Sequence, residues 1–242
     1  MSLFVMVHSP LCGPGTWHST AQALRALGHD AIVLSFTSDE TNPAPLWQQQ
    51  AQIIAEQLRE LDAQQPLIWV GHSGAGLRLP VYRNAVANPA TGYVFVDAGV
   101  PYDFPSEGMS QLDAMRREQS GFAEGLREFL INGGRFPNWT DEMLHDDIPN
   151  DNVRAMMLRE LQPQGLRYFD EPIPMPAKWP DAPCAYLHFS QSYNADATYA
   201  IDHQWAHQKI EAGHFQMLID PIGTARAIVN LKSEIKNDIQ LL

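Results

Sequence analysis

The sequence is poor in cysteine and in positive charge, and each shortage narrows the classes of protein to consider. Cys12 and Cys184 are the only cysteines among 242 residues, which excludes a disulfide framework and a C-x-x-C metal or redox pair. The chain has 16 basic and 28 acidic residues, giving a formal net charge of −12. Nucleic acids and anionic membranes attract clustered Lys and Arg, so neither is expected as a partner.

Long hydrophobic runs and cofactor motifs are also missing. The N-terminal run Leu3–Val7 has no basic flank and is too short for a signal peptide or a membrane span, so we expect a cytoplasmic protein. No Gly-rich nucleotide motif follows a strand-like run, so no cofactor is expected. His203 and His207 lack a third ligand, and Asp146-Asp147 lacks a calcium-loop signature, so no metal is expected.

What the sequence does contain is an alternation of strand-like and helix-like segments, in a chain long enough for a sizeable core. Short apolar runs lie at 3–7, 31–36, 67–70, 93–96, 184–189 and, more weakly, 207–210. Amphipathic stretches lie at 16–27, 46–61 and 220–235. Gly28 is placed to end the first of these, and Pro221 to begin the last. The pattern predicts an α/β fold, with a mostly parallel sheet of about six strands and helices on both faces.

The segment 101–180 breaks this alternation. It contains helical pieces at 111–119, 122–131 and 152–161 but no strand-like run. Five prolines between Pro172 and Pro183 then predict a stiff, extended connector. We interpret 101–180 as a helical insertion lying over a core made of residues 1–100 and 181–242.

The stretch "WVGHSGAG" at 69–76 suggests a reactive serine. A short buried strand precedes it, and a segment able to form a helix follows it. A tight strand-to-helix turn lifts a serine hydroxyl above the sheet, and small neighbours allow its strained backbone and close packing. Small residues also fill ordinary turns of this kind. Ser73 is therefore either a nucleophile or a small residue at a turn.

A histidine in "AGHFQMLIDP" lies where a base for this serine is needed. A serine nucleophile requires a base within hydrogen-bond reach and an acid that orients that base. His214 follows the last strand-like run and precedes the closing helix, and Gly213 gives its loop freedom. A histidine beside an apolar patch is often structural, but this one accompanies the serine turn in the order serine then histidine.

Three motifs together resemble the α/β-hydrolase superfamily: "FVMVHSPLCGPGTW" at 4–17, "GHSGAG" and "AGHFQMLIDP". The sequence is most similar to the compact branch of plant-type esterases and hydroxynitrile lyases, and 101–180 matches the superfamily's cap. This resemblance implies Ser73 as the nucleophile and His214 as the general base. It also implies an oxyanion hole made by backbone N–H groups near His8–Leu11 and at Gly74.

Two departures from the family pattern concern the turn and the oxyanion loop. Ala75 replaces the last glycine of G-x-S-x-G, a minor change because alanine is small. Pro10 lies where the family places its first oxyanion donor, and proline has no N–H. Losing one donor costs about 3 kcal/mol of transition-state stabilisation. Either the Leu11 N–H or the Ser9 hydroxyl substitutes, or the hole is weak.

The third departure concerns the acid. The strand-like run 184–189 is followed by serine and then glutamine rather than by glycine and a short Asp loop, and Asp196 comes a few residues late. The alternative is "YVFVDAGVP", which puts Asp97 at the carboxyl end of an earlier strand, where catalytic groups of such sheets gather. Asp97 also suits a turn cap. We favour Asp97 as the acid and keep Asp196 as the alternative.

Three functions are compatible with these residues. The first is a serine hydrolase acting on a small apolar ester, lactone or amide through Ser73, His214 and Asp97. The second is a lyase that uses the same serine and histidine for proton transfer. A weak oxyanion hole lowers the rate of such a reaction less than it lowers the rate of hydrolysis. The third is a non-catalytic small-molecule binding protein of the same fold, because fold does not dictate function.

Overall fold

The computed structural model describes residues 2–102, 104–105 and 107–235, and its centre is a parallel sheet. Within the described chain the sheet has six strands in the order β2-β1-β3-β4-β5-β6, and every neighbouring pair is parallel. The strands are β1 (Leu3–Val7), β2 (Asp30–Val33), β3 (Leu67–Ser73), β4 (Ala90–Ala98), β5 (Cys184–His188) and β6 (Ala206–Lys209). This confirms the predicted fold class.

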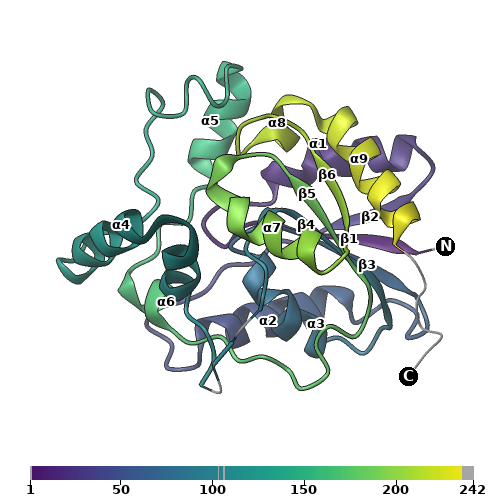
Figure 1. Cartoon of the computed structure of the whole chain (residues 1–242), viewed down its shortest axis with the longest axis horizontal. Coiled ribbons are helices and arrows are strands. Elements are labelled where there is room, and N and C mark those ends of the chain that lie inside the picture. The colour runs from purple at the N-terminus through teal and green to yellow at the C-terminus, as the bar shows by residue number, and fades with distance from the viewer. Residues whose placement is uncertain (1, 103, 106, 236–242) are drawn as a thin grey trace.

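Helices cover both faces of the sheet (Figure 1). On one face lie α1 (Gly15–Ala26) and α9 (Pro221–Glu234); on the other lie α2 (Leu46–Leu58), α3 (Leu79–Asn84) and α7 (Asn194–Asp202). Successive side chains of a strand point to opposite faces. In β1, Phe4 and Met6 therefore pack with α1 and α9, whereas Val5 and Val7 pack with α2.

Two helix ends follow the local chemistry of the sequence. Gly28 has φ of 86° just after α1, a conformation that glycine adopts without a Cβ penalty. At the start of α9 the Asp220 carboxylate accepts the N–H of Gly223, and Pro221 occupies the first turn. Both helices were predicted from their amphipathic patterns, with Gly28 and Pro221 placed at these ends.

The segment 101–180 carries α4 (Gln111–Ile131), α5 (Asp151–Arg159) and α6 (Leu166–Asp170). In Figure 1, α4 and α6 lie side by side at the end of the molecule opposite the two chain termini, whereas α5 lies apart from them and contacts α1. Two helical pieces were predicted at 111–119 and 122–131. The structure joins them into α4, but Gln119 inside it has non-helical φ of −141° and ψ of 70°, which marks a kink between the two.

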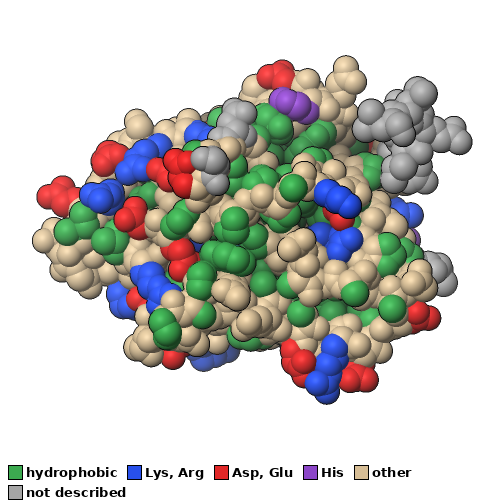
Figure 2. Space-filling model, turned by 90° about the horizontal axis from the view of Figure 1, so that it is seen from below, with side chains coloured by type: hydrophobic (Ala, Val, Ile, Leu, Met, Phe, Trp, Pro, Cys, Tyr) green, Lys and Arg blue, Asp and Glu red, His purple; other side chains and the backbone are tan. Residues whose placement is uncertain are grey.

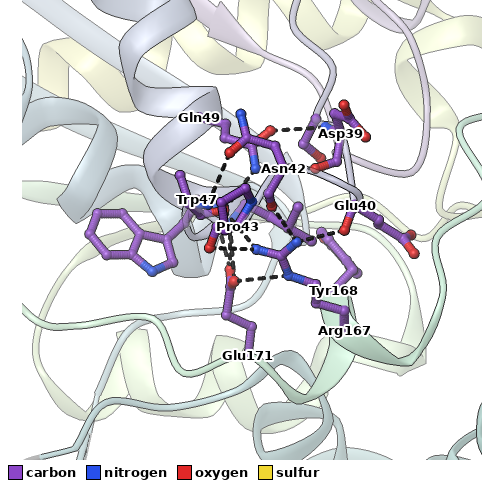
Figure 3. Close-up of polar contacts among 12 residues, drawn as sticks. Asp39, Glu40, Asn42, Pro43, Trp47, Gln49, Arg167, Tyr168 and Glu171 are labelled. Atoms are coloured by element: carbon purple, nitrogen blue, oxygen red, sulfur yellow. Dashed lines mark hydrogen bonds and ion pairs between the residues drawn. The ribbon is translucent and has the colours of Figure 1, made fainter.

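The insertion is tied to the core by an arginine and a glutamate on and after α6 (Figure 3). The Arg167 guanidinium donates to four main-chain carbonyl oxygens of one core loop, those of Glu40, Asn42, Pro43 and Ala44, at 2.6–3.3 Å. Glu171 accepts the N–H groups of Leu46 and Trp47. Since α2 has no side-chain cap of its own, Glu171 supplies the negative charge that a helix N-terminus favours.

Several elements differ from the sequence-based expectation, among them α8 (Gln216–Ile219), a short helix that was not predicted. The helix α7 was not predicted, and β2 ends at Val33 although the apolar run continues to Phe36. The short helix α6 was not predicted either. In α7 the apolar residues are few and the periodicity is weak, so the pattern that reveals a helix is faint.

Charged side chains of both signs are mixed over the face shown in Figure 2, and hydrophobic side chains gather near its centre. In the described ranges, every helix is either too short or too polar to cross a bilayer. The cytoplasmic location stays a prediction.

Candidate active site

The turn after β3 holds Ser73 in a strained backbone conformation. Its φ of 57° lies in the left-handed region that non-glycine residues rarely adopt, and such strain is common at functional sites. The turn is tightly packed as well, since a Cβ added at Gly76 would lie 2.2 Å from the carbonyl oxygen of Gly99. Ala75 is fully buried in the core. The sequence G-H-S-G-A-G therefore forms the predicted strand-to-helix turn.

The carboxylate that meets the His214 imidazole belongs to Asp97. His214 Nδ1 lies 2.7 Å from Asp97 Oδ2, and Asp97 is 0% exposed at the end of β4. The Phe189 N–H, the Ser190 N–H and the Ser190 hydroxyl also donate to Asp97, the hydroxyl at 2.6 Å. Burial acts to raise the pKa of Asp97, but the hydrogen bonds from His214 and Ser190 outweigh it and hold that pKa below its usual value. Asp97 is therefore a charged acceptor that fixes the imidazole.

Asp196, the alternative acid, lies elsewhere. It stands in the first turn of α7, and its Oδ1 accepts the Val100 N–H at 2.7 Å. Burial raises the pKa of Asp196 to about 7. The structure thus brings Asp97 to His214, and it uses Asp196 to hold the chain just beyond β4.

Tyr193 touches the serine. Its hydroxyl lies 3.0 Å from Ser73 Oγ, and its ring stacks on the His214 ring with centroids 5.3 Å apart and planes 17° apart. Sequence reasoning gave this tyrosine no role. The available signal was its position shortly after the carboxyl end of β5, where side chains of such sheets meet.

The loop after β1 supplies the groups expected near an oxyanion. The Leu11 N–H donates to Ser9 Oγ at 3.3 Å, and the Cys12 N–H donates to the Ser9 carbonyl at 2.9 Å. Ser9, Leu11 and Gly74 line the same cavity as Ser73. Pro10 is buried and has no N–H to offer. The Leu11 N–H is therefore engaged within the loop, and the Ser9 hydroxyl keeps its own proton.

Two further histidines pack around the site. His8 donates from Nδ1 to the Ser9 carbonyl and stacks on Phe36 at 4.2 Å, and burial lowers its pKa to about 4. His72 contacts the His214 carbonyl through Nε2 at 3.1 Å, and burial lowers its pKa well below the usual value. Both imidazoles are neutral at pH 7 and shape the loops that carry Ser9 and His214.

A cavity of about 790 Å³ opens above Ser73 and His214. Most of its lining residues belong to the segment 101–180, and the others come from residues 9–12, 73–77, 99, 192–196 and 214–215. Its apolar lining includes Leu11, Leu77, Leu126, Phe136, Trp139 and Phe215. The formally charged residues in the lining are Glu118, Asp147 and Asp196, all acidic. The cavity suits a neutral, largely apolar small molecule.

No group of three or more His, Cys, Asp or Glu side chains suited to a metal ion occurs in the part of the chain that the structure describes. His203 donates from Nδ1 to the Tyr199 carbonyl, and the His207 ring stacks on that of Tyr186.

Comparisons with known proteins match both the sequence and the fold. A model of the Alpha/beta hydrolase family matches residues 4–227. The probable esterase PIR7A of Oryza sativa subsp. indica is 25% identical over 184 residues, which is 70% of this chain and 69% of the relative.

Solved structures show the same fold at low sequence identity. An extracellular alpha/beta-hydrolase from a Paenibacillus species, described as sharing homology with tobacco salicylic acid binding protein 2, superposes with a TM-score of 0.72 and 18% identity over 98% of this chain and 100% of its own. A variant of tomato methylketone synthase I complexed with beta-ketoheptanoate gives a TM-score of 0.69 and 14% identity over 97% and 98% of the two chains.

Proposed function

This chain belongs to the alpha/beta hydrolase family, and from that premise we propose that it hydrolyses small, largely apolar carboxylic esters, including lactones, or related amides. The observation that carries the proposal is the 2.7 Å hydrogen bond between His214 and the buried Asp97, beside a strained Ser73 in one cavity. The segment 101–180 acts as the cap over the core formed by 1–100 and 181–242. Relatives named as esterases support the ester class.

In this reaction Ser73 is the nucleophile. His214 takes the proton of Ser73 as Oγ attacks the carbonyl carbon, and then gives it to the leaving oxygen or nitrogen as that bond breaks. Asp97 holds the imidazole through Nδ1 and stabilises its protonated form. Water then attacks the acyl-enzyme with the same help from His214 and releases the acid and free Ser73.

The oxyanion is held by the Gly74 N–H and the Ser9 hydroxyl. Gly74 follows the nucleophile, the usual position of one donor. Pro10 cannot provide the second, and the Leu11 N–H already donates to Ser9 Oγ. That bond occupies the oxygen of Ser9 and leaves its proton to point at a substrate carbonyl in the cavity.

Pro10 also favours a second candidate function. A lyase that uses Ser73 and His214 for proton transfer forms no acyl-enzyme, so it suffers less from the missing backbone donor. In that reaction Asp97 has the same orienting role. The two candidates differ in whether Ser73 becomes covalently acylated.

The test is covalent trapping with a fluorophosphonate probe, with the adduct located by mass spectrometry. We expect labelling at Ser73, none in Ser73→Ala, and labelling on the order of 100-fold slower or more in His214→Ala, because the general base is lost. Ser192→Ala, a serine of the same cavity, is the matched control and should label like the wild type. If the folded wild-type protein neither reacts with the probe nor cleaves a panel of esters, the hydrolase proposal is rejected. Turnover of cyanohydrins by that protein would then support the lyase. Tight ligand binding without turnover would support the binding protein.

A further inference from the structure

The short segment from Ser190 to Tyr193 contacts all three residues of the proposed triad. The N–H and hydroxyl of Ser190 donate to Asp97. Three residues on, the Tyr193 hydroxyl meets Ser73 Oγ at 3.0 Å, and the Tyr193 ring lies on the His214 ring. A 3₁₀ turn, Gln191–Tyr193, joins these two contacts and fixes their spacing.

The start of α7, directly after this turn, is held from the insertion. Glu118 of α4 accepts the N–H groups of Ala195 and Asp196. A carboxylate at this point satisfies donors that the helix itself leaves unpaired. The chain is thus held in place on both sides of Tyr193. Before it, Ser190 donates to Asp97, and after it, the first turn of α7 donates to Glu118 of α4.

The position of Tyr193 is on the imidazole side of the serine. Its ring plane is within 17° of the His214 plane, so the two rings lie face to face beside Ser73 Oγ. A leaving oxygen must approach His214 to receive its proton, and we infer that it then comes close to the Tyr193 hydroxyl, because Tyr193 contacts both the His214 ring and Ser73 Oγ. The groups proposed for the oxyanion, at Gly74 and Ser9, belong to other loops that line the same cavity.

We propose that Tyr193 is a further catalytic residue, whose hydroxyl rests on Ser73 Oγ in the free enzyme and donates a hydrogen bond to the leaving-group oxygen as the scissile bond breaks. This inference depends on the proposed hydrolase function. The proton itself is transferred by His214, and Tyr193 keeps its own throughout. Burial raises the pKa of Tyr193 above its usual value, which is consistent with a phenol that only donates.

This role predicts a dependence on the leaving group. An alkoxide leaving from an alkyl ester carries much charge and needs a donor, whereas a p-nitrophenolate is already stable. For Tyr193→Phe we expect kcat to fall on the order of 100-fold with ethyl or butyl esters and no more than about threefold with p-nitrophenyl esters of the same acid, with KM little changed. A ring that served only to pack His214 would be replaced by phenylalanine without such a split.

The experiment measures both ester series for the wild type, Tyr193→Phe and Tyr199→Phe, a tyrosine of α7 outside the cavity lining. Fluorophosphonate labelling of Tyr193→Phe at the wild-type rate shows that Ser73 and His214 are still assembled. Equal slowing of both series, or wild-type rates in both, overturns the role of Tyr193 and leaves the hydrolase proposal intact. A wild type that neither labels nor hydrolyses either series overturns both proposals.

Discussion

Two buried carboxylates near the ends of neighbouring strands have pKa values that are shifted in opposite directions. Asp97, at the end of β4, is 0% exposed, and Asp196, after β5, is 7% exposed. The pKa of Asp97 nevertheless lies below its usual value, whereas that of Asp196 rises to about 7. Burial opposes the charge of both. The difference comes from the donors around them, because Asp97 receives Ser190 and His214 and Asp196 is supported mainly by the Val100 N–H.

The comparison shows how one fold distinguishes the carboxylate proposed to orient the catalytic histidine from a carboxylate that holds a loop. A carboxylate that orients a histidine must stay charged at neutral pH, so it needs donors that favour the anion. A carboxylate that fixes a loop needs only an acceptor oxygen, which it has in either protonation state.

The largest effect is expected for Asp97→Asn. Asparagine fits the left-handed backbone at this position, where φ is 42°, so the fold should survive. The amide presents the wrong partner to His214 Nδ1, and we expect kcat for ester hydrolysis to fall about 10⁴-fold. Steady-state kinetics with circular dichroism checks this, and a loss of less than about tenfold would remove Asp97 from the mechanism.

A middle-sized effect is expected for Ser190→Ala, which removes the 2.6 Å hydroxyl donor to Asp97 but keeps the backbone N–H. A lost hydrogen bond to a charged group amounts to about 1.5–3 kcal/mol, so kcat should fall by roughly 10- to 100-fold. The pKa of Asp97 should move upward, because a donor that stabilises its charged form is lost. Ser192→Ala should leave kcat unchanged, and an unchanged kcat in Ser190→Ala would contradict the proposed support of Asp97.

The smallest effect on activity is expected for Asp196→Asn, which keeps an oxygen for the Val100 N–H. Its effect should be on stability. The folded-state pKa of about 7 exceeds the ordinary 3.8, so the stability that protonated Asp196 contributes is full below about pH 4 and is lost as pH rises through 7.

Asparagine has no proton to lose at this position. Unfolding near pH 4 should therefore give similar Tm values for Asp196→Asn and the wild type, whereas at pH 8 the Tm of the variant should be higher by at least about 2–4 °C, the shift that roughly 1 kcal/mol produces in a chain of this size. A variant that is less stable than the wild type at pH 8 would show that Asp196 is held as a stabilised anion.

Much of the fold was accessible from sequence because its signals are local. The apolar strands, the glycine after α1 and the Asp220-Pro221 start of α9 are each written within a few residues. The helix α7 was missed because what fixes its start is Glu118, a residue of another helix. The kink at Gln119 falls where the sequence predicted the end of one helical piece, but the pattern did not show that the two pieces join into one helix.

The residues of the candidate site also fall into two groups, those that local sequence motifs indicate and those that depend on contacts between distant segments. Ser73 and His214 were singled out because each lies in a recognisable local motif, the strand-to-helix turn and the loop before the last helix. Asp97 was favoured over Asp196 because of its place at the carboxyl end of a strand, but the sequence left Asp196 open, because the choice depends on how the ends of β4 and β5 pair in space. Tyr193 was overlooked for the same reason, since its contact with Ser73 joins residues 120 positions apart.

The arginine that anchors the insertion has a consequence for how this protein can diverge. Three of the oxygens that Arg167 binds are the carbonyls of Asn42, Pro43 and Ala44, which every residue type carries. Because these bonds are made to main-chain oxygens, they depend on the path of the loop and not directly on the side chains of these residues. Pro43 and Ala44 can therefore change as long as that path is kept, whereas the Asn42 side chain helps to hold it by accepting the Ala44 N–H at 3.0 Å.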